Sequence, residues 1–179
     1  MRHHFSAISG MESTEEIKSY LSKVQTNLDE YRYIGKTSNK MLDLILSKYD
    51  FVCAKSGIKF NAEVRASNLS FINDDDLVAL LSNMLDNAAE SAKGSENAYI
   101  DFSVKNEKSF VVLNVKNSCA VEPKIIGDSL QTTKTDGDMH GYGTKSIKTT
   151  AKKYNGVCEW HYNENEHSFL CTVLFNRSN

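Results

Sequence analysis

Five short segments with alternating apolar and polar residues constrain the fold of this chain more than any other feature. They read IKFNAEV, YIDFSV, FVVLNV, VCEWHY and FLCTVLF, at residues 58–64, 99–104, 110–115, 157–162 and 169–175. A period of two is typical of β-strands with one buried face. The short connection KNEKS between the second and third segments is typical of a hairpin. We therefore expect a mixed, mostly antiparallel sheet.

Two helical segments lie between these strands, at about residues 74–92 and 143–154. The sequence NDDDL provides a cap and a negative first turn for the first helix. Its expected buried arc consists of Leu77, Leu80, Leu81, Met84, Leu85 and Ala88. The second helix is expected to bury Ile147, Ala151 and Tyr154 and to end at Asn155. Helices on one face of such a sheet predict an α+β fold, a two-layer sandwich.

Residues 1–56 have a helical pattern instead. One apolar stripe follows a capping-box signature and contains Ile17, Tyr20, Leu21, Val24, Leu28 and Tyr31. A second contains Met41, Leu44, Ile45, Lys48, Phe51 and Val52, and Gly57 is the expected C-cap. Two tandem stripes predict an antiparallel helical pair with apolar surface left over, so a homodimer is expected. The predicted domains are this helical segment, 1–56, and the sandwich, 57–179.

Composition excludes several classes of protein. The net charge is −2 and the lysines and arginines are dispersed, which gives no reason to expect nucleic-acid binding. No apolar run approaches the roughly 18 residues that a membrane span needs. The 4 cysteines show no CxxC pairing or metal-ligand spacing, so reduced thiols in a cytosolic compartment are expected.

Two asparagines interrupt the apolar run LLSNMLDNAAESA at residues 80–92. Asn83 and Asn87 are four residues apart, so they lie together at one edge of the buried arc. Amides are poor core residues and only middling helix formers. They either hydrogen-bond to a neighbouring loop or hold a ligand, and spacing alone leaves both readings open.

A pair of glycines stands where the second helix begins. In HGYGTKSIKTTAKKYNG, Gly141 and Gly143 allow a ligand to approach the backbone closely, and the free N–H groups of a helix start attract phosphate. The polar stretch before them contains Lys134. Residues 117–142 have no clear period and form the longest expected loop.

These motifs resemble a known family. NMLDNAAES resembles the N-box of the GHKL ATPases, which include DNA gyrase, MutL and the sensor histidine kinases, and HGYGTKSI resembles their second glycine box. The sequence is most similar to sensor kinases of the Agr quorum-sensing type, in LDNAAE, TTKTDGDMHGYGTKSIK and NKMLDLILSKYDFVCAKSGIKF. The resemblance implies a Bergerat-type ATP-binding fold and ATP and Mg²⁺ as cofactors.

The resemblance also implies roles at the phosphates. Asn87 matches the residue whose amide oxygen ligates Mg²⁺, a cation that takes oxygen ligands and keeps several waters. Asn83 matches the residue that faces the γ-phosphate, where gyrase-type members carry a carboxylate that activates water. An amide cannot act as a general base, which suits phosphoryl transfer to a side chain. Gly141 and Gly143 match the glycines at the phosphates.

Three further residues are implied in binding the cofactor. Lys134 matches the basic residue of the ATP lid, expected at about 118–140, and His140 belongs to the same stretch. Asn117 stands where the broader family has the adenine-binding Asp of a DxGxG box, although the glycines that follow it there are absent. An amide oxygen can accept from the adenine amine; the alternative is that Asn117 is merely a turn residue.

The implied phosphoacceptor is His3, in MRHHF, which resembles a box that usually reads Arg-His-Asp. Here His4 replaces the carboxylate that would orient the imidazole and take its proton, and Ala7 replaces a family asparagine. The alternative is a solvated helix start, or residues added at a truncated terminus.

Two functions are compatible with the sequence. The first is the cytoplasmic part of a dimeric two-component sensor histidine kinase, which passes the γ-phosphoryl group to a histidine and then to a response regulator. Its membrane sensor would precede residue 1. The second is a nucleotide-binding regulatory module without autokinase activity.

Overall fold

The computed structural model describes residues 37–65, 69–126, 129–131 and 142–177. All of them belong to the second of two compact units, Tyr33–Asn179. The first unit, Met1–Arg32, lies outside the described residues, and with it the predicted stripe from Ile17 to Tyr31. None of the described helices is long and apolar enough to cross a membrane.

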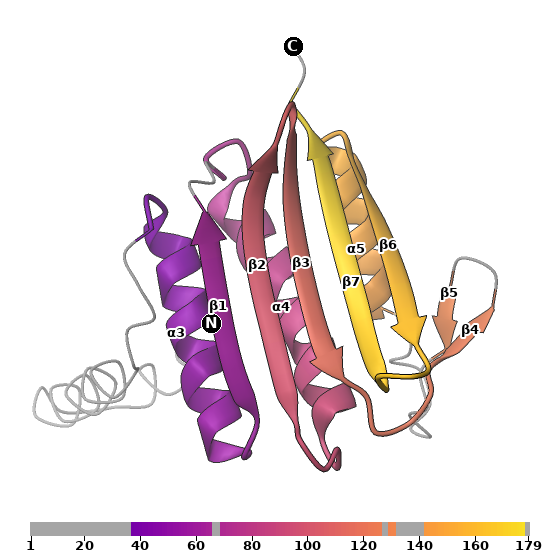
Figure 1. The fold of residues 1–179 in the computed structure, drawn as a ribbon. Helices are drawn as coiled ribbons and strands as arrows, with labels where there is room; N and C mark the ends of the chain where they lie inside the picture. The colour runs from indigo at the N-terminus through magenta and orange to yellow at the C-terminus, as the bar shows by residue number, and fades with distance from the viewer. Residues whose placement is uncertain (1–36, 66–68, 127–128, 132–141, 178–179) are drawn as a thin grey trace, which may run out of the picture. The chain divides into compact units, whose positions relative to one another are not determined.

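A five-stranded sheet forms one layer of this unit (Figure 1). The strands are β1 (Lys59–Arg65), β2 (Tyr99–Glu107), β3 (Phe110–Ser118), β6 (Gly156–Asn163) and β7 (Ser168–Asn176). Their order is β1-β2-β3-β7-β6; β1 and β2 are parallel, and every other neighbouring pair is antiparallel. The five predicted strands and the hairpin between β2 and β3 are therefore confirmed.

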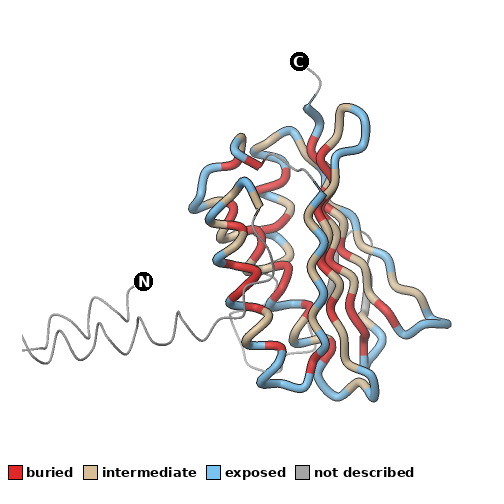
Figure 2. The backbone as a smooth tube through the Cα atoms, turned by 60° about the vertical axis from the view of Figure 1, so that its left-hand side comes forward, coloured by how far each residue is buried: buried red, intermediate tan, exposed pale blue. Residues whose placement is uncertain are grey.

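Three helices form the second layer and cover one face of the sheet: α3 (Lys40–Lys55), α4 (Asp74–Ala92) and α5 (Tyr142–Lys153). Buried residues are concentrated where the helix layer and the sheet meet (Figure 2). All six residues of the arc predicted for α4 are at most 3% exposed. The α+β sandwich with its helices on one face is thus confirmed.

The apolar face predicted for α3 is wrong in part. Its buried residues are Leu42, Ile45, Leu46, Ser47, Tyr49 and Cys53, whereas Leu44 and Val52 are 48% and 38% exposed. The apolar residues of α3 are distributed around most of its circumference, so its sequence is compatible with two different apolar stripes at helical spacing. Packing against α4 and β1 selects one of them. Helix α3 contributes to the core of the sandwich. The predicted domain boundary at 56/57 stays a prediction, because most of residues 1–56 lie outside the described residues.

The helix ends are formed by local interactions. Gly57 has a φ of 69° and follows α3, and the Ile58 N–H donates to the Cys53 carbonyl over 2.9 Å, as expected for a glycine C-cap. The cap predicted for α4 differs: Asn73 stands at the N-cap position, but its side chain makes no capping hydrogen bond. Its backbone N–H donates to the Tyr154 hydroxyl instead, over 3.2 Å.

The stretch predicted as a long loop contains a small antiparallel ladder. Strands β4 (Lys124–Ile126) and β5 (Ser129–Gln131) pair through Ile125 and Leu130. Three-residue strands are too short to show alternation, which explains why the sequence did not reveal them.

Candidate functional site

Helix α4 presents two amides at the edge of its buried arc. Asn83 is half-buried and Asn87 is exposed. The Asn83 amide nitrogen donates to the Ala79 carbonyl over 2.7 Å and to the Ser146 hydroxyl of α5 over 3.2 Å. The Asn87 side chain makes no hydrogen bond within the described part of the chain, so its oxygen is available to a ligand.

Both amides converge on Gly143, in the first turn of α5. A Cβ atom at Gly143 would lie 3.3 Å from Asn83 Oδ1, 3.4 Å from Asn87 Oδ1 and 3.6 Å from Asn87 Nδ2. A side chain here would therefore fill the space that the two amides face. Because the first N–H groups of a helix have no intrahelical partner, this space combines hydrogen-bond donors with amide oxygens.

Interactions at the other end of the two helices hold them antiparallel. Lys153 Nζ lies 2.6 Å from Asp76 Oδ2, and the Tyr154 hydroxyl donates to the same oxygen. These two hydrogen bonds, first that of Lys153 and then that of Tyr154, lower the pKa of Asp76. These contacts of Lys153 and Tyr154 with Asp76, called the clamp below, fix α5 along α4 and so keep Gly143 beside the asparagines.

A third contact supports α4 from its other side. The buried Tyr49 hydroxyl of α3 donates to Asp86 Oδ1 over 2.7 Å and to the Ser82 carbonyl over 3.2 Å. Burial, followed by the hydrogen bond to Asp86, raises the pKa of Tyr49. The tyrosine anchors the helix turn immediately before Asn87.

Ser91 continues the line of Asn83 and Asn87 by one more turn and reaches the end of β3. Its hydroxyl lies 3.0 Å from Cys119 Sγ, and its carbonyl accepts from the Ala120 N–H over 3.2 Å. One edge of α4 thus runs from the start of α5 to the residues that follow β3.

Asn117 lies in β3, opposite Ile100 and Phe169, and is 1% exposed on the face that the helices cover. Its amide nitrogen donates to the Ser118 carbonyl over 2.7 Å, which turns the amide oxygen away from that partner. The alternative that Asn117 is merely a turn residue is wrong, since it is a paired, buried strand residue.

The structure brings Asn83, Asn87 and Gly143 together, while Asn117 is the last residue but one of β3. His3, Lys134, His140 and Gly141 lie outside the described residues. Sequence reasoning missed the supporting side chains Ser91, Ser146 and Asp86. Only Ser91 carried a usable signal, because it repeats the four-residue spacing of the two asparagines.

The residues at this site fit Mg²⁺ bound with phosphate. Two amide oxygens face a space without a side chain, and the described residues contain no group of three or more His, Cys, Asp or Glu side chains that could hold a metal by themselves. Mg²⁺ commonly uses one or two protein oxygens together with phosphates and water. Asn87 would supply such an oxygen, with Asn83 beside it.

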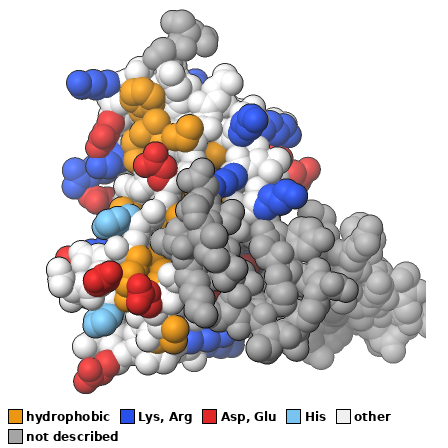
Figure 3. Space-filling model, turned by 90° about the vertical axis from the view of Figure 1, so that its right-hand side faces the viewer, with side chains coloured by type: hydrophobic (Ala, Val, Ile, Leu, Met, Phe, Trp, Pro, Cys, Tyr) orange, Lys and Arg blue, Asp and Glu red, His pale blue; other side chains and the backbone are white. Residues whose placement is uncertain are grey.

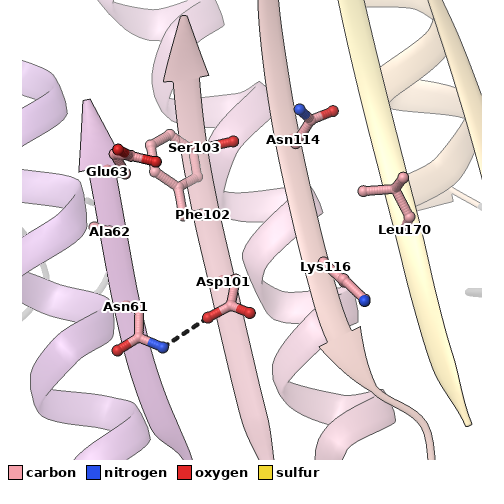
Figure 4. A pocket seen from close by; sticks show the side chains of 9 residues that line it. All are labelled: Asn61, Ala62, Glu63, Asp101, Phe102, Ser103, Asn114, Lys116 and Leu170. Carbon is pink, nitrogen blue, oxygen red and sulfur yellow. Dashed lines mark hydrogen bonds between the residues drawn. The ribbon is translucent and has the colours of Figure 1, made fainter. Parts of the chain in front are cut away.

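Another hollow, of about 400 Å³, lies on the opposite, open face of the sheet (Figure 4). Its polar lining is already engaged in part: Asn61 donates to Asp101 over 2.6 Å, and Lys116 pairs with Glu166. None of the predicted site residues lines it. It is therefore separate from the site between α4 and α5.

Comparisons with known proteins identify the family of this domain. A family model described as a GHKL domain matches residues 72–176. The catalytic domain of histidine kinase ThkA is 18% identical, with a TM-score of 0.61, over 79% of this chain and 93% of that one. Histidine kinase AdeS of Acinetobacter baumannii is 12% identical, with a TM-score of 0.57, over 99% and 93%.

The mycobacterial sensor histidine kinase MprB is 13% identical, with a TM-score of 0.53, over 74% of this chain and 93% of that one. Identities this low show a shared fold alone. No curated protein matches the chain significantly. The family match covers more than half of the sequence and includes α4 with its two asparagines and all of α5. The chain therefore belongs to the GHKL domain family.

Proposed function

We propose that this chain binds Mg-ATP with the phosphates between α4 and the start of α5. The observation that carries the proposal is the convergence of the Asn83 and Asn87 amide oxygens on Gly143. Asn87 is assigned to Mg²⁺, which neutralises phosphate charge when bound, and Asn83 to the γ-phosphate. The helix N-terminus supplies N–H donors to the remaining phosphate oxygens.

Adenine is assigned to the far end of the same edge, at Asn117. Its amide oxygen, on the helix-covered face of β3, can accept from the adenine amine. Lys134 and His140 are assigned to a lid over the phosphates, together with Gly141 at the helix start.

The reaction that this arrangement supports best is phosphoryl transfer in a two-component sensor histidine kinase of the Agr type. Phosphoryl transfer depends mainly on positioning and charge neutralisation. Asn83 and Asn87 carry no carboxylate that could activate water, so bound ATP is kept for an acceptor side chain. His3 is the proposed acceptor, a homodimer the proposed assembly, and a response regulator the final recipient.

A second candidate function is a nucleotide-binding module that acts through a partner without phosphorylating itself. The sequence at the acceptor favours it, because His4 and Ala7 replace residues that the kinase box uses. The loss of a carboxylate beside His3 is expected to slow transfer by about 10² or more.

Calorimetry with ATP, in the presence and absence of Mg²⁺, tests the binding proposal. Asn87→Ala should abolish the Mg²⁺-dependent part of the affinity. Asn61→Ala is the matched control, because Asn61 is an exposed asparagine on the opposite face of the sheet. Equal Mg²⁺-dependent binding by wild type and Asn87→Ala would remove Asn87 from the site.

Incubation with γ-labelled ATP and Mg²⁺ separates the two candidates. A kinase should give a label that is lost in acid and survives alkali, as a phosphohistidine does. The label should disappear in His3→Ala and form faster in His4→Asp, while both variants keep ATP binding. ATP binding without any protein-bound label would favour the regulatory module.

A further inference from the structure

Two cysteines at the β6 edge of the sheet come close together across a pair of antiparallel strands. Cys158 lies in β6 and Cys171 in β7, where Cys158 is opposite Val173 and Cys171 is opposite Trp160. The two cysteines are therefore diagonal neighbours on one face of the sheet. Their sulfur atoms are 3.9 Å apart, and both thiols are free.

The surroundings of the pair shift the pKa values of its two thiols in opposite directions. The hydrogen bond with Cys171, followed by the positive charge of Lys148, lowers the pKa of Cys158. The same hydrogen bond, followed by burial, raises the pKa of Cys171. Lys148, on α5, lies with its ammonium group 4.6 Å from the centre of the Trp160 ring. A cation beside a partly exposed cysteine is the environment in which cysteines react as nucleophiles.

Accessibility also distinguishes the two sulfurs. Cys158 is half-buried on an edge strand, whereas Cys171 is 7% exposed. On this side of the molecule, hydrophobic side chains reach the surface beside lysines and arginines (Figure 3). Cys158 is thus the more accessible of the two to a small oxidant, and Cys171 beside it is placed as a resolving thiol.

The other two cysteines lack these features. Cys53 is fully buried, and burial raises its pKa to about 11. Cys119 is hydrogen-bonded to Ser91 and to the Val121 carbonyl, at the end of β3. Among the four cysteines, only the β6–β7 pair combines a second sulfur with a nearby cation.

We propose that Cys158 and Cys171 form a redox-active pair that peroxide oxidises to a disulfide between β6 and β7. The Cys158 thiolate attacks one peroxide oxygen, the O–O bond breaks, and hydroxide leaves and takes up a proton as water. Cys171 then attacks the sulfenic sulfur, the S–O bond breaks, and a second water leaves with the Cys171 proton. Two thiols are oxidised and one peroxide is reduced to two waters.

Forming the disulfide requires the two sulfurs to move closer together. The sulfurs must close from 3.9 Å to about 2.0 Å, the length of a disulfide bond. Diagonal neighbours across an antiparallel pair are typically about 7–8 Å apart, so the edge strand β6 must shift toward β7 as the two side chains rotate.

The test treats the full chain with stoichiometric hydrogen peroxide and maps the disulfides. Cleavage after glutamate separates the two cysteines, because Glu159, Glu164 and Glu166 lie between them in the sequence. The expected result is one linked pair of peptides, an intact mass lower by about 2 Da, as the loss of two thiol protons requires, and full reversal by dithiothreitol.

Two variants sharpen the result. Cys171→Ala should lose the linked peptides and accumulate sulfinic acid at Cys158, since no resolving thiol remains. Cys119→Ser is the matched control and should form the same disulfide as wild type. Links to Cys53 or Cys119, or oxidation of Cys158 without any link in the wild type, would overturn the proposal. The wild-type map decides the question even if Cys171→Ala does not fold.

Discussion

Replacing Gly143 with alanine separates the role of this residue in the fold from its role in binding. The new methyl group would lie 3.3 Å from Asn83 Oδ1 and 3.4 Å from Asn87 Oδ1, in the space assigned to phosphate. The nearest atoms belong to the ends of two flexible side chains, so the protein can accommodate the methyl group by shifts of a few tenths of an ångström.

The effect on stability should be small. Alanine within a helix is favoured over glycine by about 0.8–1.0 kcal/mol, and less in a first turn. Displacing Asn83 weakens its hydrogen bond to Ser146, a loss of about 0.5–1.5 kcal/mol. The two effects oppose each other, so the free energy of unfolding should change by less than about 1 kcal/mol, measured by urea denaturation.

The effect on nucleotide binding should be large. A lost hydrogen bond to a charged phosphate is worth about 1.5–3 kcal/mol. That corresponds to a Kd about 10- to 100-fold higher, measured by calorimetry with ATP and Mg²⁺.

Gly57→Ala is the matched control, because a Cβ at Gly57 meets nothing within 4 Å but its φ of 69° is left-handed. It should lower stability by about 1–2 kcal/mol and leave the Kd unchanged. An unaltered Kd for Gly143→Ala would refute the assignment of phosphate to this space.

Three further changes test the packing around the site. Tyr49→Phe removes the hydrogen bond between α3 and Asp86 and should lower the free energy of unfolding by about 1–3 kcal/mol; an unchanged urea midpoint would contradict this role. Leu81→Ala leaves a cavity at a fully buried position and should cost about 2–5 kcal/mol, and a smaller loss would mean that the layers collapse around it. Because Lys153 lowers the pKa of Asp76, the stabilisation by this carboxylate is complete above its ordinary pKa of 3.8 and is lost as the pH falls below that value. In a plot of melting temperature against pH, Asp76→Asn should therefore lose less stability at acid pH than the wild type. An equal loss in both proteins would exclude a stabilising contact of Asp76 with Lys153 and Tyr154.

Local sequence patterns determined most of the secondary structure. The period-two alternation located all five strands of the main sheet, and the arc from Leu77 to Ala88 is buried as expected. These patterns succeed because each element of a two-layer sandwich must bury one face, and that requirement is written along the segment itself. The spacing of Asn83 and Asn87 likewise placed both amides at the edge of the core.

The sequence could not determine which of two apolar stripes on α3 is buried. Leu44 and Val52 belong to a stripe with helical spacing, yet they face outward while Leu42 and Tyr49 pack inward. Both stripes satisfy the same periodicity, so only the neighbouring surfaces of α4 and β1 distinguish them.

Only the tertiary structure brought the site together. Gly143 is 56 residues from Asn87 in the sequence, and their contact depends on the antiparallel packing of α4 and α5 and on the clamp at Asp76. The diagonal approach of Cys158 to Cys171 depends in the same way on the register between β6 and β7. Residue types and spacing specify which faces are buried, whereas packing between distant segments decides which functional groups meet.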